Sequence, residues 1–279
     1  MTRWRFIHTG RRSPAENMAI DEAVLTAHSE GKVPPTVRFY GWNPPSLSIG
    51  FFQKAAEVQM SELTDRGIGF VRRATGGRAV LHDQELTYSM IVSEDYPDMP
   101  RSVTEAYRVL SEGLRLGFEN LGLHAEMVNL AVEEDKEKYR SEGSAACFDS
   151  PSWYELVVEG RKIAGSAQTR AKGVILQHGS ILQEIDVELL FDLLQFPNDK
   201  VKERMMQSFR RKAVAINDIL RGVGKAEVTL EMLEAAFRGG IAAGLQVHLE
   251  DGELTAYEQE LAAQLAVEKY GNPEWNLRK

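Results

Sequence analysis

The chain contains segments with the two-residue period of strands and segments with the period of helices. Arg3–Thr9 alternates apolar and polar positions and predicts a strand, whereas Met18–Ala27 has apolar residues at helical spacing. Ser13-Pro14-Ala15-Glu16 precedes that helix and has the pattern of a capping box with proline at the first helical position. The pattern therefore predicts an N-terminal strand followed by a capped helix.

The middle of the chain predicts a sheet with helices inserted. A helix is predicted at about residues 55–66, and another at residues 102–122 opens with the capping-box sequence Ser102-Val103-Thr104-Glu105. The second helix has one apolar face, which consists of Val103, Tyr107, Leu110, Leu114, Phe118 and Leu121. The strand segments are rich in β-branched and aromatic residues: Thr36–Trp42, Ser46–Phe52, Gly69–Thr75, Ala79–His82, Leu86–Val92 and Ala125–Leu130.

A charged stretch and a meander follow. Glu133–Gly143 has no apolar period and predicts a loop. Three further strands are predicted, with a hairpin turn at Glu159-Gly160 between the first two: Tyr154–Val158, Lys162–Thr169 and Gly173–Gln183. From Asp186 the pattern is mainly helical, with a last capping box at Thr255. We therefore expect an α/β (α+β) fold with mixed or antiparallel central sheets flanked by helices, not a doubly wound parallel fold.

Composition limits the class of protein. The chain has 279 residues, 43% of them hydrophobic, and one cysteine, which allows a sizeable core and excludes an internal disulfide. No apolar run is long enough for a transmembrane helix, and no signal peptide is visible, so we expect a cytoplasmic protein that does not bind a membrane. The net charge of −8 disfavours nucleic acid as a partner. We expect a single domain over residues 1–279 with a helical C-terminal region from about 186, although a division near Asn198 or Val223 stays open.

The first candidate site is the arginine- and glycine-rich segment from Arg72 to Asp83. Its adjacent glycines, Gly76 and Gly77, lie between two predicted strands, where they allow positive φ and close approach of a ligand to the backbone. Exposed N–H groups in such a turn can stabilise an oxyanion. The segment lacks the spacing of a phosphate-binding P-loop or a dinucleotide fingerprint. A plain hairpin turn with flanking arginines is the alternative interpretation.

The single cysteine and a strand lysine form the second candidate. Cys147 follows the charged stretch and has small neighbours, which favours an accessible thiol over a buried hydrophobic one. Lys162 lies in the small-residue segment Gly160–Gln168, and a lysine facing the thiol would lower its pKa. The spacing does not show that the two residues meet, and a solvated surface lysine is the alternative. His82 is the one histidine inside a motif, and no metal-ligand spacing appears, so we expect no metal.

Together these segments resemble a known superfamily. Residues 72–83 are similar to the RRxTGGxAVxHD motif of the biotin/lipoate protein ligases and lipoyl/octanoyl transferases. Gly160–Gln168 is similar to their GxKIxGSAQ motif, and the Tyr-Gly-x-x-x-Trp-Asn ending at 270–276 is also similar. Within the superfamily, the LipM group of octanoyltransferases carries a cysteine in the loop before the lysine strand, where Cys147 stands. The resemblance implies the mixed-sheet catalytic-domain fold of these enzymes.

The resemblance also implies a reaction. It predicts an acyltransferase of lipoate biosynthesis that moves octanoyl from octanoyl-acyl carrier protein to a lysine of a lipoyl domain, such as the glycine-cleavage H protein, without a cofactor. Cys147 would be the acyl-thioester nucleophile, and Lys162 would lower its pKa and orient the acyl carbonyl. The residues implied in substrate binding are Arg73, Thr75, Gly76, Gly77, Arg78, His82, Gly165, Ser166 and Ala167. An ATP-dependent lipoate-protein ligase, an octanoyl amidotransferase between lipoyl domains and a non-catalytic carrier-binding module are the alternatives.

Docking of acidic carrier proteins on an acidic chain requires a local positive surface. The candidates are the arginines at 72, 73 and 78 and the cluster Ser208-Phe209-Arg210-Arg211-Lys212. For the second cluster, an ordinary solvated helix face is the alternative.

Overall fold

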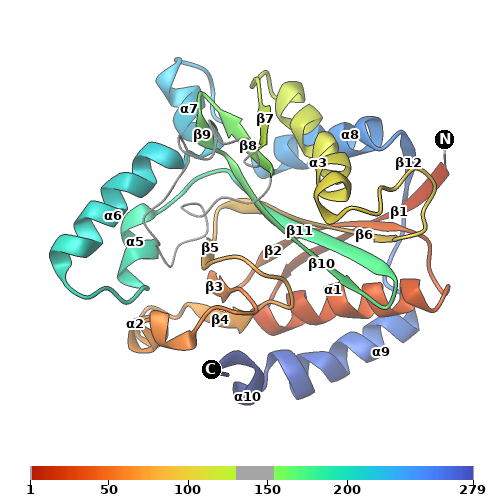
Figure 1. Ribbon diagram of the computed structural model, residues 1–279, viewed down its shortest axis with the longest axis horizontal. Helices are drawn as coiled ribbons and strands as arrows, with labels where there is room; N and C mark the ends of the chain where they lie inside the picture. The colour runs from red at the N-terminus through yellow and green to blue at the C-terminus, as the bar shows by residue number, and fades with distance from the viewer. Residues whose placement is uncertain (1, 130–153, 279) are drawn as a thin grey trace.

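The computed structural model of the protein describes residues 2–129 and 154–278, and a six-stranded mixed sheet forms its centre (Figure 1). The first four strands in the sheet order pair antiparallel and the last three pair parallel. In sheet order they are β10 (Ala164–Ala171), β11 (Val174–Leu182), β6 (Glu85–Ser93), β2 (Thr36–Trp42), β1 (Thr2–Arg12) and β12 (Val247–Asp251).

Two three-stranded sheets lie beside the central one. The first has the order β4 (Gly69–Arg72), β3 (Ser46–Ile49) and β5 (Val80–His82), and the second has the order β7 (Glu126–Asn129), β8 (Tyr154–Val158) and β9 (Arg161–Lys162). In the first, β3 pairs parallel with β4 and antiparallel with β5. The first of these small sheets flanks the arginine-glycine segment with β4 and β5, and the second carries Lys162, whereas the rest of the lysine motif continues into β10 of the central sheet.

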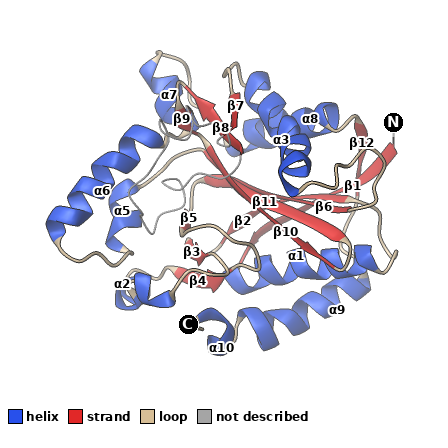
Figure 2. Ribbon diagram, viewed as in Figure 1, coloured by secondary structure: helices blue, strands red, loops and turns tan. Residues whose placement is uncertain are grey.

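Helices cover both faces of the central sheet (Figure 2). α1 (Pro14–Ser29) and α9 (Ala256–Leu265) lie on one face, and α3 (Val103–Asn120) and α8 (Leu230–Gly244) lie on the other. Alternate residues of β2 serve the two cores, since Phe39 packs with the α3–α8 side and Tyr40 with the α1 side. The remaining helical segments are η1 (Ala55–Glu57), α2 (Met60–Asp65), α5 (Val187–Asp192), α6 (Asp199–Lys212), α7 (Ile216–Gly222), η3 (Ala266–Tyr270) and α10 (Pro273–Asn276). No helix in the described part of the chain is long and apolar enough to cross a membrane.

The predicted fold class is confirmed, and so are several local details. The capping boxes at Ser13 and Thr255 are both present, and the strands at 36–42 and 154–158 have the predicted bounds. Glu159 and Gly160 have φ values of 51° and 73°, as a tight hairpin turn with two left-handed residues requires. Local sequence was sufficient where the stabilising contacts are themselves local.

Other local predictions were wrong, because more distant contacts outweigh the local pattern. The predicted helix at 55–66 is interrupted, since Val58 forms a bridge with Leu194 and Gln59 N donates to Leu193 O at 2.9 Å. The box at Ser102 is absent, because Glu105 instead pairs with Arg108.

Three other differences concern the predicted strands and the apolar face of α3. Val103, which was assigned to that apolar face, is 51% exposed. Strand β12 was missed, and it is held at the sheet edge by parallel pairing with β1. The predicted strand Lys162–Thr169 is divided at Ile163, so Lys162 and Gly165 belong to different sheets.

Candidate active site

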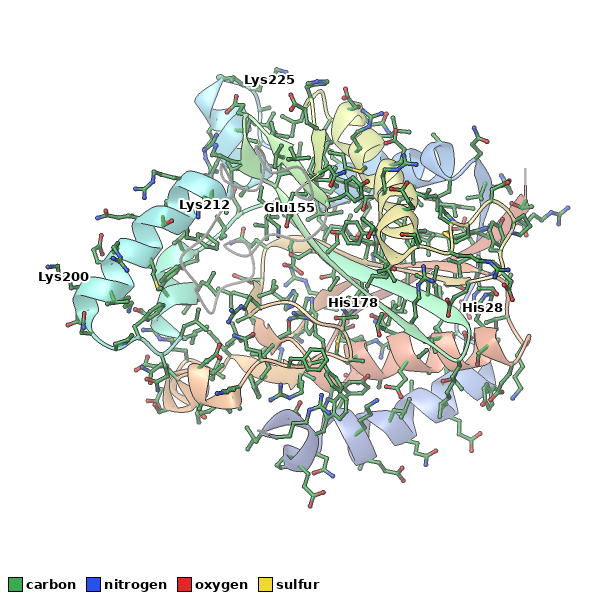
Figure 3. The ribbon with its side chains drawn as sticks, viewed as in Figure 1. His28, Glu155, His178, Lys200, Lys212 and Lys225 are labelled. Atoms are coloured by element: carbon green, nitrogen blue, oxygen red, sulfur yellow. The ribbon has the colours of Figure 1, made fainter. Side chains whose placement is uncertain are left out.

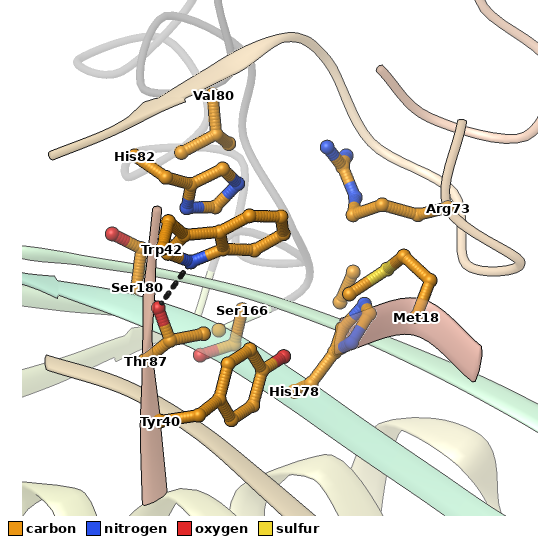
Figure 4. A pocket seen from close by; sticks show the side chains of 13 residues that line it. Met18, Tyr40, Trp42, Arg73, Val80, His82, Thr87, Ser166, His178 and Ser180 are labelled. Carbon is orange, nitrogen blue, oxygen red and sulfur yellow. Dashed lines mark hydrogen bonds between the residues drawn. The ribbon is translucent and has the colours of Figure 1, made fainter. Parts of the chain in front are cut away.

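A small cavity opens where β10 and β11 approach β2, β5 and α1 (Figure 4). Most of its wall is apolar, with a few polar side chains converging on it. The cavity brings both sequence motifs together, because each contributes to its wall. The lining residues are Met18, Tyr40, Trp42, Arg73, Val80, His82, Thr87, Gly165, Ser166, Ala167, His178, Gly179 and Ser180.

The glycine loop packs tightly against the chain that follows β3. Gly77 has a φ of 94°, which side-chain-bearing residues rarely adopt. A Cβ atom on Gly50 would lie 2.0 Å from the Gly77 carbonyl oxygen, and Phe51 N donates to Thr75 O at 2.8 Å. The loop therefore requires glycine at position 50 as well, a position that the sequence analysis did not identify.

Arg72 is a structural residue, not part of a docking surface. Its side chain is 1% exposed, and burial, together with the charge of Arg278, lowers its pKa. It ties β4 to the residues after β3 and to the end of the chain, so the docking prediction for Arg72 was wrong. The guanidinium donates to six backbone carbonyls, those of Gly50, Phe51, Gln53, Trp275, Asn276 and Arg278.

The C-terminal motif supplies the other half of this junction. Trp275 Nε1 donates to Arg72 O at 2.9 Å, and Arg72 N donates to Asn276 Oδ1 at 2.8 Å. The helical segment η3 ends at Tyr270, and Gly271, its C-cap, has a φ of −87° and does not form a left-handed cap. A Cβ at that position would lie 2.6 Å from Ala266 O, so close packing is the reason for glycine.

The other two arginines of the motif have different environments. Arg73 is 5% exposed and donates to Ser48 Oγ at 2.6 Å and to the carbonyls of Gly76 and Arg78, which excludes it from a docking surface. Arg78 is partly exposed and lies 3.6 Å from Glu57. Arg73 thus holds the glycine loop from within and lines the cavity.

His82 has both ring nitrogens engaged at the cavity wall. Nδ1 lies 2.6 Å from Glu85 Oε1, and Nε2 lies 2.6 Å from Ser48 Oγ. Ser48 Oγ also accepts from Arg73, so Arg73, Ser48, His82 and Glu85 form one continuous hydrogen-bonded chain. The ring also stacks on Trp42, with centroids 4.0 Å apart. The structure therefore places His82 in the cavity wall, and its role in substrate binding stays a prediction.

A second histidine at the cavity was missed by the sequence analysis. His178 Nδ1 lies 3.1 Å from Asp21 Oδ2, and Nε2 lies 2.7 Å from Thr75 Oγ1. Burial lowers the pKa of His178, an effect that Asp21 only partly offsets. Burial alone would raise the pKa of Asp21, but Arg38 and the hydrogen bonds to the carboxylate outweigh it and the pKa is lowered. A neutral His178 therefore links α1 to the glycine loop through Thr75.

One signal in the sequence could have identified this pair. Asp21 lies three residues after Met18 and four before Leu25, on the buried side of α1. A carboxylate at an apolar helix position requires a polar partner from another element. Strand β11 provides it in His178.

We expect the environment of His178 to make stability depend on pH. The pKa of His178 is lower in the folded protein than in the unfolded chain, where it is near 6.5. The contribution of His178 to the free energy of unfolding is therefore fully present above about pH 6.5 and is lost as the pH falls toward the folded pKa. The contribution is at most about 1.4 kcal/mol per pH unit. Urea unfolding between pH 7.5 and 5 should show a shallower pH dependence in His178→Gln than in wild type.

The exposed His248 of β12 provides the control for that experiment. Because its side chain is solvated, His248→Gln should retain the wild-type pH profile. Identical profiles for His178→Gln and wild type would contradict the assigned protonation state.

Lys162 is buried in an ion pair that the sequence analysis also missed. Its Nζ lies 3.0 Å from Glu155 Oε1 and 2.9 Å from Oε2, and the two side chains are only 8% and 5% exposed. Figure 3 shows Glu155 on the β8–β9 side of the molecule, away from His178. The pairing Val157↔Lys162 across the tight turn places Glu155, two residues before Val157, on the same face of the hairpin. That register could have been derived from the sequence, and the solvated-lysine interpretation is wrong.

The remaining predicted site features differ in how far the structure describes them. Cys147 and the predicted loop at 133–143 lie outside the described residues. Within residues 2–129 and 154–278, no group of three or more His, Cys, Asp or Glu side chains could hold a metal ion. Helix α6 carries six cations and two anions, and Lys200 lies at its outer end (Figure 3). The docking role of this helix stays a prediction.

Comparison with known proteins identifies the family. Residues 13–238 match the family model described as lipoyl protein ligase A/B catalytic domain. An octanoyltransferase LipM from Brevibacillus brevis is 64% identical over 280 residues, which is 100% of both chains. The chain belongs to the LipM octanoyltransferase family. A second LipM octanoyltransferase, from Geobacillus kaustophilus, is 58% identical and covers 99% of this chain and 98% of its own.

A solved structure supports the ligase-type fold of this LipM family member. The bi-partite lipoate protein ligase from Thermoplasma acidophilum, described together with its E2 lipoyl domain, superposes with a TM-score of 0.80. It is 26% identical and covers 99% of this chain and 97% of its own. The resemblance seen in the sequence motifs is therefore confirmed at the level of family and fold.

Proposed function

We propose that this LipM family member transfers an octanoyl group from octanoyl-acyl carrier protein to a lysine of a lipoyl domain, such as the glycine-cleavage H protein. Octanoyl transfer in protein lipoylation follows from membership of the family, and the donor and acceptor are the proposed part. The observation that carries the proposal is the 64% identity with a LipM octanoyltransferase over the whole chain. The cavity, together with the buried Lys162 three residues before Gly165 of its wall, supports an acyl-binding site with a fixed cation near it in the chain.

The proposed chemistry has two acyl transfers. In the first, the Cys147 thiolate attacks the donor thioester, a new C–S bond forms, and the carrier thiol leaves. In the second, the neutral amine of the acceptor lysine attacks the enzyme thioester, an amide forms, and the thiolate is released. Because a thioester is converted to an amide, the two-step reaction is thermodynamically favourable without ATP.

The cavity is the proposed site of the octanoyl chain. Gly165 in its wall lies three residues after Lys162, about 10 Å along an extended chain at roughly 3.3 Å per residue. A carbonyl next to Lys162 would thus leave the alkyl chain within reach of the cavity. Each methylene of the chain that is buried there would contribute about 0.8 kcal/mol.

We expect Val80→Phe to shorten the preferred acyl chain, because a larger side chain in the cavity wall displaces terminal methylenes. Octanoyl transfer should lose roughly fourfold in kcat/KM for each methylene that no longer fits, at about 0.8 kcal/mol per methylene, while butanoyl transfer is retained. Steady-state kinetics with carrier-bound acyl groups of two to eight carbons would measure this. Val223→Phe, at a position that is 57% exposed, is the control. An unchanged chain-length profile in Val80→Phe would exclude this cavity as the acyl site.

One assay separates this function from its alternatives. The protein is incubated with octanoyl-acyl carrier protein without nucleotide, and its intact mass is measured. An adduct of one octanoyl group that hydroxylamine removes is expected. Absence of the adduct, with ATP-dependent modification of an H protein by free lipoate, would identify a lipoate ligase instead. Transfer only from an octanoylated lipoyl domain would identify an amidotransferase, and stable carrier binding without turnover would identify a binding module.

A further inference from the structure

The buried Glu155–Lys162 pair poses a chemical question, because this enzyme acylates lysine and contains a lysine at its own site. We propose that Glu155 holds Lys162 as an ammonium ion, so that Lys162 positions the acyl thioester without being acylated by it. The inference rests on the proposed acyl transfer. It applies whether the thioester is on the carrier protein or on the enzyme. Glu155 is in this view a positioning residue that acts through Lys162.

The geometry fits a fixed cation. Both oxygens of Glu155 lie within 3.0 Å of Nζ, a two-point contact that defines the position of the ammonium group. The main chain of Lys162 is held as well, by pairing with Val157 and by the hydrogen bond from Val214 N to Lys162 O at 3.0 Å. Separating the two groups would cost free energy, because both charges are buried.

Because Lys162 is buried, its protonation state depends on the carboxylate of Glu155. Removing a lysine from water favours its neutral form, by as much as roughly 3–5 in pKa for fully buried groups. A carboxylate in contact favours the ammonium form. Other negative charges near the pair are few among the described residues. Glu159 pairs with Arg161 at 2.9 Å at the hairpin turn, and Glu126 of β7 lies opposite Val157. Helix α6 ends in two cations, Arg211 and Lys212. Among the described residues, Glu155 is therefore the carboxylate whose contact with Lys162 favours the ammonium form.

The protonation state decides whether Lys162 is a reactant. An ammonium ion has no lone pair and cannot attack a thioester. A neutral Lys162 amine would attack the carbonyl carbon, forming a C–N bond and breaking the C–S bond, and its proton would pass to the departing thiolate. The product would be an octanoyl amide on the enzyme, which the second transfer cannot use. The acceptor lysine must be neutral to react, so the pairing with Glu155 distinguishes the enzyme's own lysine from the substrate's.

The test is Glu155→Gln, which keeps the size of the side chain and removes its charge. After incubation with octanoyl-acyl carrier protein, peptide mapping of this variant should show a hydroxylamine-resistant octanoyl group on Lys162, at least tenfold above wild type, with progressive loss of turnover. Glu159→Gln is the matched control, because Glu159 lies in the same hairpin and its side chain is 57% exposed. Glu155→Asp should show less adduct than Glu155→Gln, and Glu155→Gln combined with Lys162→Arg should show none.

A second measurement does not depend on turnover. With lysines labelled by ¹³C at Cε, and the Lys162 signal assigned by Lys162→Arg, the pH dependence of that signal is compared in wild type and in Glu155→Gln. The Lys162 signal of Glu155→Gln should titrate at least one pH unit below that of wild type. Loss of activity without the Lys162 adduct, or an unshifted titration, would overturn the proposal.

Two outcomes outside this pattern are also informative. If Glu155→Gln does not fold, wild type incubated with the donor at rising pH should itself accumulate the Lys162 adduct, and its absence up to the pH of unfolding overturns the inference. If wild type transfers no octanoyl group, the proposed function fails, while the titration still reports on Glu155.

Discussion

Replacing Cys147 with alanine is expected to abolish the acyl-enzyme and to lower octanoyl transfer by on the order of 10³- to 10⁶-fold, the range for removal of an enzymatic nucleophile. No other thiol can substitute, because the chain has a single cysteine. Direct attack of the acceptor amine on the carrier thioester would be the residual route. The measurement is transfer of radiolabelled octanoyl from acyl carrier protein to an H protein, with intact-mass analysis of the enzyme.

The controls for that variant concern folding and the order of events. The free energy of unfolding of Cys147→Ala should lie within about 1 kcal/mol of the wild-type value. A loss of activity would then be due to the missing nucleophile and not to unfolding. Cys147→Ser should accumulate a more slowly formed oxygen ester, since a hydroxyl is a weaker nucleophile than a thiolate. Full activity in Cys147→Ala would exclude the covalent mechanism and would favour direct attack of the acceptor amine on the carrier thioester.

Replacing Arg72 with methionine is expected to destabilise the protein by about 3–5 kcal/mol, although the residue touches no proposed substrate atom. The change removes the donors to six backbone carbonyls at once, and each buried acceptor left without a partner costs about 1–3 kcal/mol. Water entering the gap would recover part of that loss. Arg72→Lys should be intermediate, because an ammonium group has three donors in place of five.

Urea unfolding measures the loss, and Arg78→Met is the matched control. Arg78 belongs to the same motif but is partly exposed, so its replacement should change the free energy of unfolding by less than about 0.5 kcal/mol. Hydrogen exchange at residues 275–278 should accelerate in Arg72→Met well before global unfolding, because the chain end is attached there. Equal stability of Arg72→Met and wild type would show that these carbonyls are satisfied without the guanidinium.

The sequence motifs predicted which segments form the site, but not what each residue in them does. Arg73, His82 and Gly165 were predicted to bind substrate, and all three lie in one cavity wall although the chain between them is long. Arg72 looked equivalent to Arg73 in the sequence, yet it serves the junction with the chain end. The spacing between two arginines carries no information about which carbonyls surround them.

Two buried carboxylates were not identified from the sequence. Asp21 lies in the predicted N-terminal helix and Glu155 in a predicted strand, and neither drew attention because a lone carboxylate is usually solvated. Each becomes informative only when its partner is known: His178 for Asp21, and Lys162 for Glu155. The hairpin register linked Glu155 to Lys162 within seven residues, whereas the Asp21–His178 pair spans 157 residues and required the assembled sheet.

What the sequence determined by itself is the class of fold, the family and the identity of the two chemical motifs, because strand and helix periods, capping boxes and tight turns depend on neighbours in the chain. Only the tertiary structure decided which charges are buried and which partner each one meets. Burial is set by the packing of distant segments. It determines whether Arg72 contacts a partner protein or donates hydrogen bonds to the backbone of its own chain. It likewise determines whether Lys162 is a solvated charge or a cation held by Glu155.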